Sequence, residues 1–179
     1  FDPAYLELKR VVRSGKYGKV LQIRCTPRNV SSPTATTAML LTNVAVHEVD
    51  VIRWILNEEI KSVNVNLTKV TSKANSKLLD PISVNCYTES GVLATIDICA
   101  NSTYGYEVGM EVITESASLV VENLGELTIV KDFYLPNRKS GKLHKDWMGR
   151  FKPAYIAELN AFVESIKKRK LHPNFATAN

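Results

Sequence analysis

Residues 42–56 combine an almost continuous apolar pattern with one polar stripe. Four side chains recur there at steps of four, three and four residues, which places them on one face of an α-helix: Asn43, His47, Asp50 and Trp54. Nearly all other positions are apolar, so we expect a helix that is buried nearly all round. A buried, unsatisfied imidazole would cost about 1–3 kcal/mol. His47 is therefore expected to have a polar partner, either structural or a ligand in a cleft.

Alternating apolar and polar positions predict β-strands both before and after this helix in the sequence. After residue 82 the alternating segments are joined by short turns, and short turns require antiparallel pairing because a parallel partner needs a long crossover. The expected strands are residues 19–25, 60–70, 82–88, 92–100, 107–114, 118–122 and 126–133.

Two further helices are expected near the ends of the chain. Asp2 and Pro3 form a typical helix start, and Gly15 ends that helix. Apolar residues recur at helical spacing over residues 148–168. The predicted fold class is α+β: one domain over residues 1–179, with an open, mostly antiparallel sheet of about six strands and helices packed on one face.

The uncovered face of the predicted sheet is expected to be partly apolar. In the strand at residues 92–100, Leu93 and Cys99 alternate onto the same side as Thr95 and Asp97. A partly apolar open face is typical of a surface that packs on another copy of the chain. We therefore expect a homo-oligomer, a dimer or tetramer, formed through this face.

Composition indicates a soluble globular domain, with 45% apolar and 23% charged residues. No run of eighteen apolar residues is present, so no membrane partner is expected. The chain starts at Phe1 without a leader pattern, and we expect a fragment of a protein that has no signal peptide. Three cysteines without CxxC spacing are typical of reduced thiols, which favours a cytoplasmic location.

The net charge of +5 raises the question of a nucleic-acid partner. Lysines and arginines are spread along the chain, except for a cluster at residues 167–170, where a helix is expected to end. Cations at that position complement the helix dipole. No basic segment with interspersed aromatics accompanies the charge, so no nucleic-acid partner is expected.

Common motifs for nucleotides, metals and nucleophiles are missing. The eight glycines form neither GxGxxG nor GxxxxGK. The zinc motif HExxH is absent. Of the possible metal ligands in the central helix, only His47 and Asp50 share a face, and His144 and Asp146 form only a weak pair, so no metal site is expected. A serine hydrolase would need GxSxG, which is also missing.

Four segments of the chain, in this order, resemble the second domain of the Gfo/Idh/MocA oxidoreductases, and within them the inositol 2-dehydrogenases: FDPAYLELKRVVRSGKYGKVL, NVAVHEVDVIRWIL, GVLATIDICANSTYGYEVGMEVIT and DWMGRFKPAYIAELNAFVESI. The resemblance implies a two-domain dehydrogenase of a cyclic polyol or sugar, of which this chain is the substrate-binding and oligomerisation domain. It also implies NAD or NADP, bound mainly by a Rossmann domain that would precede Phe1. That domain would carry the lysine of an EKP motif, so this chain alone is expected to be inactive.

The resemblance also implies which residues carry the chemistry. The family motif reads D-x-x-x-H-[DE]-x-D, and His47 matches the histidine that takes the proton from the substrate hydroxyl. Asn43 stands where the motif has its first aspartate. An amide can hydrogen-bond an imidazole, but it does not stabilise an imidazolium as a carboxylate does. The expected catalytic residues are thus His47 and Asn43.

Further residues at family positions are expected to bind the substrate. In the segment CTPRN the chain keeps Asn29, but Pro27 replaces the histidine that inositol dehydrogenases carry there. Val44, Tyr104 and Tyr106 are expected to line the polyol pocket. Without the resemblance, the two tyrosines could equally be an aromatic pair at the edge of the sheet.

Two alternatives to a dehydrogenase remain open from the sequence. The replacements at positions 43 and 27 also fit a non-catalytic sugar-binding or scaffold relative of the same fold. The basic stretch at residues 139–145 fits an adaptor that binds acidic partners.

Overall fold

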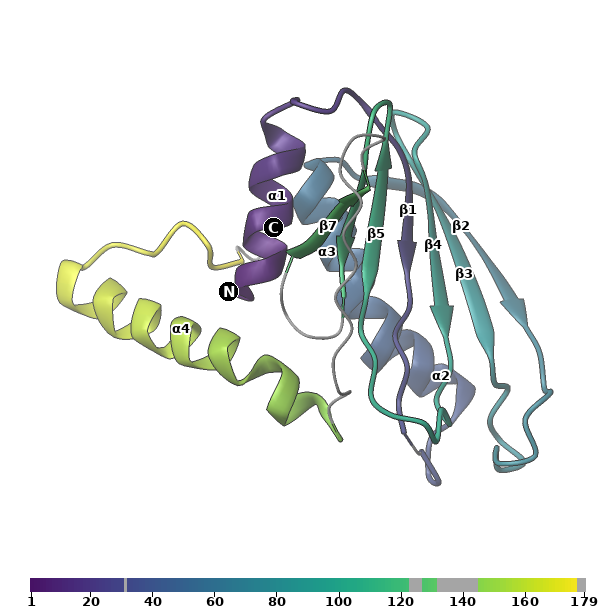
Figure 1. The fold of residues 1–179 in the computed structure, drawn as a ribbon. Helices are drawn as coiled ribbons and strands as arrows, with labels where there is room; N and C mark the ends of the chain where they lie inside the picture. Colours follow the sequence, from purple (N-terminus) through teal and green to yellow (C-terminus); the bar gives the residue numbers. More distant parts are fainter. Residues whose placement is uncertain (31, 123–126, 132–144, 177–179) are drawn as a thin grey trace.

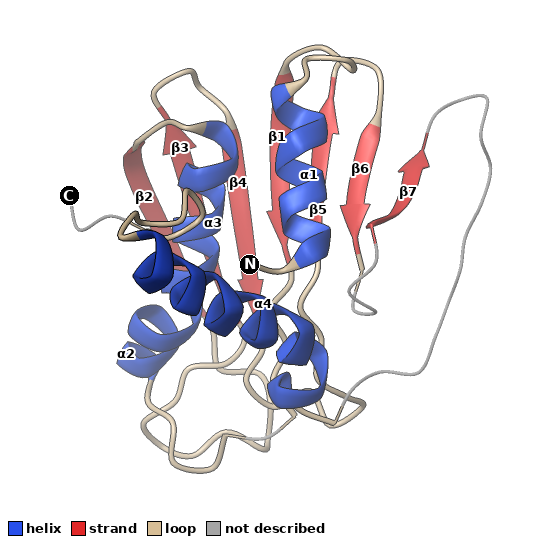
Figure 2. Ribbon diagram, turned by 90° about the vertical axis from the view of Figure 1, so that its left-hand side faces the viewer, coloured by secondary structure: helices blue, strands red, loops and turns tan. Residues whose placement is uncertain are grey.

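The structure is a computed structural model that describes residues 1–30, 32–122, 127–131 and 145–176 (Figure 1). One sheet forms one layer of the molecule, and the helices lie on one of its faces (Figure 2). The sheet has seven strands in the order β2-β3-β4-β1-β5-β6-β7. The predicted α+β class, with an open sheet covered by helices on one face, is confirmed.

The elements follow the predicted order closely. The helical segments are α1 (Pro3–Arg13), α2 (Thr37–Leu40), the π-helical turn η1 (Leu41–Ala45), α3 (Val46–Leu56) and α4 (Trp147–Lys168). The strands are β1 (Val20–Cys25), β2 (Ile60–Leu67), β3 (Ile82–Thr88), β4 (Leu93–Ile98), β5 (Met110–Thr114), β6 (Ser118–Val121) and β7 (Leu127–Lys131). The sequence did not predict α2, which extends the central helix toward the N-terminus.

Most neighbouring strands pair antiparallel, as expected from their short connections. The exception is β1, which lies parallel to β4 and antiparallel to β5. The chain between β1 and β2 contains α2, η1 and α3, and so it is long enough to leave the sheet and re-enter at its far edge. This crossover places α3 across the sheet (Figure 2).

Helix α3 packs on the sheet with one face only. Its inward positions recur at steps of three and four and are Ala45, Glu48, Ile52 and Ile55. Asn43, His47 and Asp50, by contrast, are exposed. The expectation that this helix is buried nearly all round, and His47 with it, is wrong. Helix α4 lies outside α1 and α3, farther from the sheet (Figures 1 and 2), and the side of α3 that faces away from the sheet lines a cavity.

The buried polar residue of α3 is Glu48, which is only 4% exposed. The thiol of Cys25, at the end of β1, donates a hydrogen bond to its carboxylate. Burial disfavours the charged form and raises the pKa of Glu48 to about 7. This carboxyl group therefore carries a proton for part of the time at neutral pH.

Helix α4 joins the body through a buried ion pair near its start. Nη1 of Arg150 lies 2.6 Å from Oδ2 of Asp2, and both side chains are almost completely buried. The other carboxylate oxygen of Asp2 accepts hydrogen bonds from the backbone N–H groups of Ala4 and Tyr5, and so caps α1. One carboxylate thus holds the starts of α1 and α4 together. In the described part of the chain, no helix is long and apolar enough to cross a membrane.

The raised pKa of Glu48 makes stability depend on pH. Between about pH 4.5 and about pH 7 the folded state holds a proton that the unfolded state has released. The free energy of unfolding should therefore fall as pH rises through this range, by up to about 3 kcal/mol. We expect Glu48→Gln to remove this fall, as measured by urea unfolding at several pH values.

The matched control is Glu164→Gln, because Glu164 is an exposed carboxylate paired with Lys168 on α4. That variant should keep the fall in stability of the parent protein. An unchanged fall in Glu48→Gln would contradict the assignment of the buried proton to Glu48.

Candidate functional site

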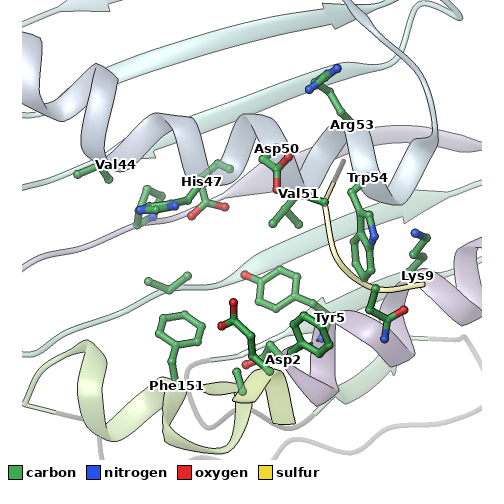
Figure 3. A pocket seen from close by; sticks show the side chains of 18 of the residues that line it. Asp2, Tyr5, Lys9, Val44, His47, Asp50, Val51, Arg53, Trp54 and Phe151 are labelled. Carbon is green, nitrogen blue, oxygen red and sulfur yellow. Dashed lines mark hydrogen bonds between the residues drawn. The ribbon is translucent and has the colours of Figure 1, made fainter. Parts of the chain in front are cut away.

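A cavity of about 1120 Å³ lies between α1, α3 and α4. Figure 3 shows Val44 and His47 on one side, along η1 and α3, with Tyr5 and Phe151 facing them from α1 and α4. The segment at residues 27–29, Tyr106 and the C-terminal residues 173–176 complete the lining. Parts of the chain far apart in sequence therefore enclose one space.

Five of the predicted site residues meet in this cavity: Asn29, Asn43, Val44, His47 and Tyr106. The imidazole of His47 is exposed, so a ligand can reach it directly. Asn43 precedes it by four residues, in the π-helical turn, and the Asn43 side-chain oxygen lies 3.0 Å from the Thr42 hydroxyl, which donates to it. The Asn43 carbonyl thus already has a local donor.

The segment that carries Asn29 is held in place by its backbone. Asn29 donates its N–H to the carbonyl of Cys99 (2.9 Å) and accepts from the N–H of Ser102 (2.7 Å). Arg28 and Glu107 exchange two backbone hydrogen bonds. These bonds continue the pairing of β1 with its neighbours beyond the strand end and bring residues 27–29 to the rim of the cavity. Pro27 is buried and offers no polar side chain there.

The two predicted tyrosines are separated by a turn. Gly105 donates its N–H to the carbonyl of Ser102, so Tyr104 lies in the turn and Tyr106 follows it. Tyr106 lines the cavity, and burial raises its pKa to about 12, which keeps the phenol protonated.

Tyr104 does not reach this cavity. It donates to Oε2 of Glu107 at 2.7 Å and lines a separate hollow of about 460 Å³. That hollow also contains Ser83 and Asp97, which alternate along β3 and β4 with buried core residues. The structure therefore brings Tyr106, and not Tyr104, together with His47.

Tyr5 and Glu48 are among the lining residues that the sequence analysis did not single out. Burial and the nearby charge of Glu48 raise the pKa of Tyr5 well above its usual value. A signal for Glu48 was present, because it falls three residues after Ala45 and four before Ile52, on the apolar face of the helix. A polar residue at such a position is expected to have a special environment.

The chemistry available in the cavity is proton transfer and hydrogen bonding. His47 can accept a proton from a ligand hydroxyl, while Asn29 and Tyr106 offer neutral hydrogen-bonding groups. Within the described residues, no group of three or more histidine, cysteine or acidic side chains could hold a metal ion.

The known proteins that this chain is similar to include inositol 2-dehydrogenases. Over 177 residues the chain is 37% identical to an inositol 2-dehydrogenase of Klebsiella pneumoniae, covering 96% of this chain and 50% of that protein. It is 34% identical over 165 residues to an inositol 2-dehydrogenase/D-chiro-inositol 3-dehydrogenase of Shouchella clausii, covering 92% of this chain and 46% of that protein. The chain thus spans about half the length of these curated relatives.

Solved structures show the same fold. A myo-inositol dehydrogenase of Lactobacillus casei, in complex with NAD(H) and myo-inositol, superimposes with a TM-score of 0.81 at 24% identity, over 96% of this chain and 50% of that one. A myo-inositol dehydrogenase of Corynebacterium glutamicum gives a TM-score of 0.76 at 20% identity, over 97% and 54%. The family model of the GFO/IDH/MocA C-terminal domain matches residues 5–120. The chain therefore belongs to the Gfo/Idh/MocA family, as a C-terminal domain.

Proposed function

We propose that this chain is the substrate-binding domain of an NAD(P)-dependent dehydrogenase that acts on a cyclic polyol or sugar. The observation that carries the proposal is the exposed imidazole of His47 in a cavity shared with Asn29, Asn43 and Tyr106. The names of the relatives, which are inositol 2-dehydrogenases, support an inositol-like substrate.

In this proposal His47 acts as general base. It takes the proton of the reacting hydroxyl as the carbinol carbon loses its hydride, so that the alcohol becomes a ketone. Asn29 and Tyr106 would fix the other hydroxyls of the ring by hydrogen bonds and so orient the carbinol carbon. Val44 would contribute an apolar contact beside His47 (Figure 3).

NAD or NADP would supply the hydride acceptor. The described residues offer no glycine-rich phosphate loop, so the cofactor would be held mainly by the half of the protein that this chain does not span. The residues present fit such a cofactor at His47, because this side chain is exposed and the nicotinamide ring could approach a substrate bound beside it. Exposed apolar residues on α4, namely Ile156, Leu159 and Phe162, also favour a second domain that would cover them.

The first test is His47→Ala in the complete protein. We expect kcat with myo-inositol to fall by about 10²–10⁴-fold, because the general base is lost. Cofactor binding, measured by fluorescence titration with NADH and NADPH, should stay unchanged. Turnover is followed by the absorbance of the reduced cofactor, which also shows which of the two is used.

The matched control for this test is His172→Gln. His172 packs against Phe1 and Phe175 and does not line the cavity, so its loss should leave kcat unchanged. A complete protein that reduces neither cofactor with any inositol, hexose or sugar acid would overturn the proposal.

A non-catalytic sugar-binding relative is the second candidate. It is favoured by the neutral Asn43, whose carbonyl already accepts from Thr42, and by Pro27 in place of a polar residue. Both features leave the shape of the cavity intact but weaken its acid–base chemistry.

Asn43→Asp separates the two candidates. A carboxylate four residues before His47 would stabilise the imidazolium formed during oxidation, so we expect kcat to rise about tenfold or more. The control is Asn64→Asp, the same change on the exposed strand β2, where no effect on kcat is expected. A parent without turnover that stays without turnover after Asn43→Asp would favour the non-catalytic candidate.

We also propose a homo-oligomer that packs through the uncovered face of the sheet, in a cytoplasmic protein without a nucleic-acid or membrane partner. Support comes from half-buried apolar side chains on that face, including Leu93, Ile113 and Val120, among polar ones. Light scattering of the complete protein tests this, and a monomer at micromolar concentration would contradict it. The basic stretch proposed for an adaptor, residues 139–145, lies almost wholly outside the described residues.

A further inference from the structure

The inner part of the cavity contains groups that the proposed hydride transfer does not use. Tyr5, Glu48 and Tyr106 come from α1, α3 and the segment before β5, and all three line the same space. Tyr5 and Glu48 are buried, whereas His47 is exposed. The cavity therefore has an open side with an imidazole and an enclosed side with a carboxyl group and two phenols.

The position of Glu48 is fixed by its surroundings. Its neighbours at steps of three and four, Ala45 at the end of η1 and Ile52 of α3, are buried. The fully buried thiol of Cys25 donates a hydrogen bond to its carboxylate from behind. A side chain held from the helix and from the strand presents its carboxyl group to the cavity at low entropic cost.

No cation among the described residues forms a salt bridge with Glu48. Arg150 lies close enough to influence the phenols of Tyr5 and Tyr106, but its Nη1 pairs with Asp2 at 2.6 Å. Within the described residues the Cys25 thiol is a hydrogen-bond donor to Glu48, and a carboxylate can accept several hydrogen bonds. A ligand hydroxyl could supply one of them.

We propose that Glu48 is a further ligand-binding residue of this cavity, whose carboxyl group, fixed by Cys25 and flanked by Tyr5 and Tyr106, accepts a hydrogen bond from a ligand hydroxyl. The inference rests on the proposed function, since it takes the ligand to be a polyol. It extends that function by giving the ring a second attachment point on the enclosed side, away from the exposed His47.

A dependence of binding on pH follows from this placement. The titratable groups that interact with Glu48 are Tyr5 of α1, Cys25 of β1 and Tyr106. Beyond them, Asp2 and Arg150 act on Tyr5, and Arg150 and Tyr155 act on Tyr106. Burial holds the pKa of Glu48 at about 7. A hydroxyl donor binds the ionised carboxylate more strongly than the acid. Ligand binding should therefore release a proton from Glu48, and affinity should rise with pH.

The experiment measures binding of myo-inositol to the complete protein by calorimetry, with NAD present, between about pH 6 and about pH 8. His47 is first replaced, so that the comparison isolates the contribution of Glu48. In the His47→Asn protein we expect the affinity to rise about fivefold over this range, which corresponds to a Glu48 pKa about one unit lower in the complex. In the double variant His47→Asn with Glu48→Gln the rise should vanish.

The control is His47→Asn with Glu7→Gln, which removes an exposed carboxylate of α1 that pairs with Arg10. This protein should keep the rise in affinity. Glu48→Gln is close in shape to the protonated acid, and its thermal unfolding at about pH 6 should match that of the parent.

The outcomes separate the two proposals. Binding whose pH dependence is the same with and without Glu48→Gln overturns the role of Glu48 and leaves the proposed function in place. No binding of myo-inositol, other inositols or hexoses by the otherwise unmodified protein overturns the proposed substrate class, and the role of Glu48 with it.

Discussion

The packing of α3 on the sheet decides where every group of the site points. Ala45, Ile52 and Ile55 are buried against the strands, and this fixes the rotation of the helix about its axis. With the rotation fixed, His47 must face outward and Glu48 must face inward, because neighbouring residues of a helix are about 100° apart. Two residues that are adjacent in sequence thus differ in burial: His47 is exposed to water and Glu48 is buried. The cavity between α3, α1 and α4 touches both.

The second constraint is the carboxylate of Asp2. It accepts two backbone hydrogen bonds from α1 and pairs with Arg150 of α4, so it fixes the position of α4 relative to α1. Breaking a buried pair of this kind leaves an uncompensated charge, which typically costs about 3–5 kcal/mol. Since α1 and α4 both line the cavity, this ion pair joins two walls of the site. Two segments at opposite ends of the chain thereby become parts of one site.

Much of the fold follows from local patterns. Period-two alternation located the strands, and the helical period located α1, α3 and α4, because both patterns reflect burial of one face. Other features depend on contacts that no local pattern encodes. The parallel pairing of β1 with β4 depends on where the crossover re-enters the sheet. The assumption that α3 is buried all round failed because the side of the helix that faces away from the sheet lines a cavity.

In the site, too, some residues follow from sequence motifs and others depend on the three-dimensional fold. The residues expected from the helix motif, His47 and Asn43, and Asn29 from the segment CTPRN, all line one cavity. The family resemblance did not separate Tyr104 from Tyr106, since the turn closed by Gly105 sends them to different surfaces.

Glu48 is the buried carboxyl group of α3. Its carboxyl group is buried beside a thiol and two phenols, which are weak partners for a charge. A helix that only had to pack on the sheet would place an apolar residue at this position, as it does at Ile52, and would gain stability by doing so. The carboxyl group therefore imposes a cost on the fold, and that cost is reduced when a hydroxyl donor enters the cavity. A site built in this way is less stable empty than filled, and it favours ligands that can donate a hydrogen bond on the enclosed side while a second hydroxyl faces His47.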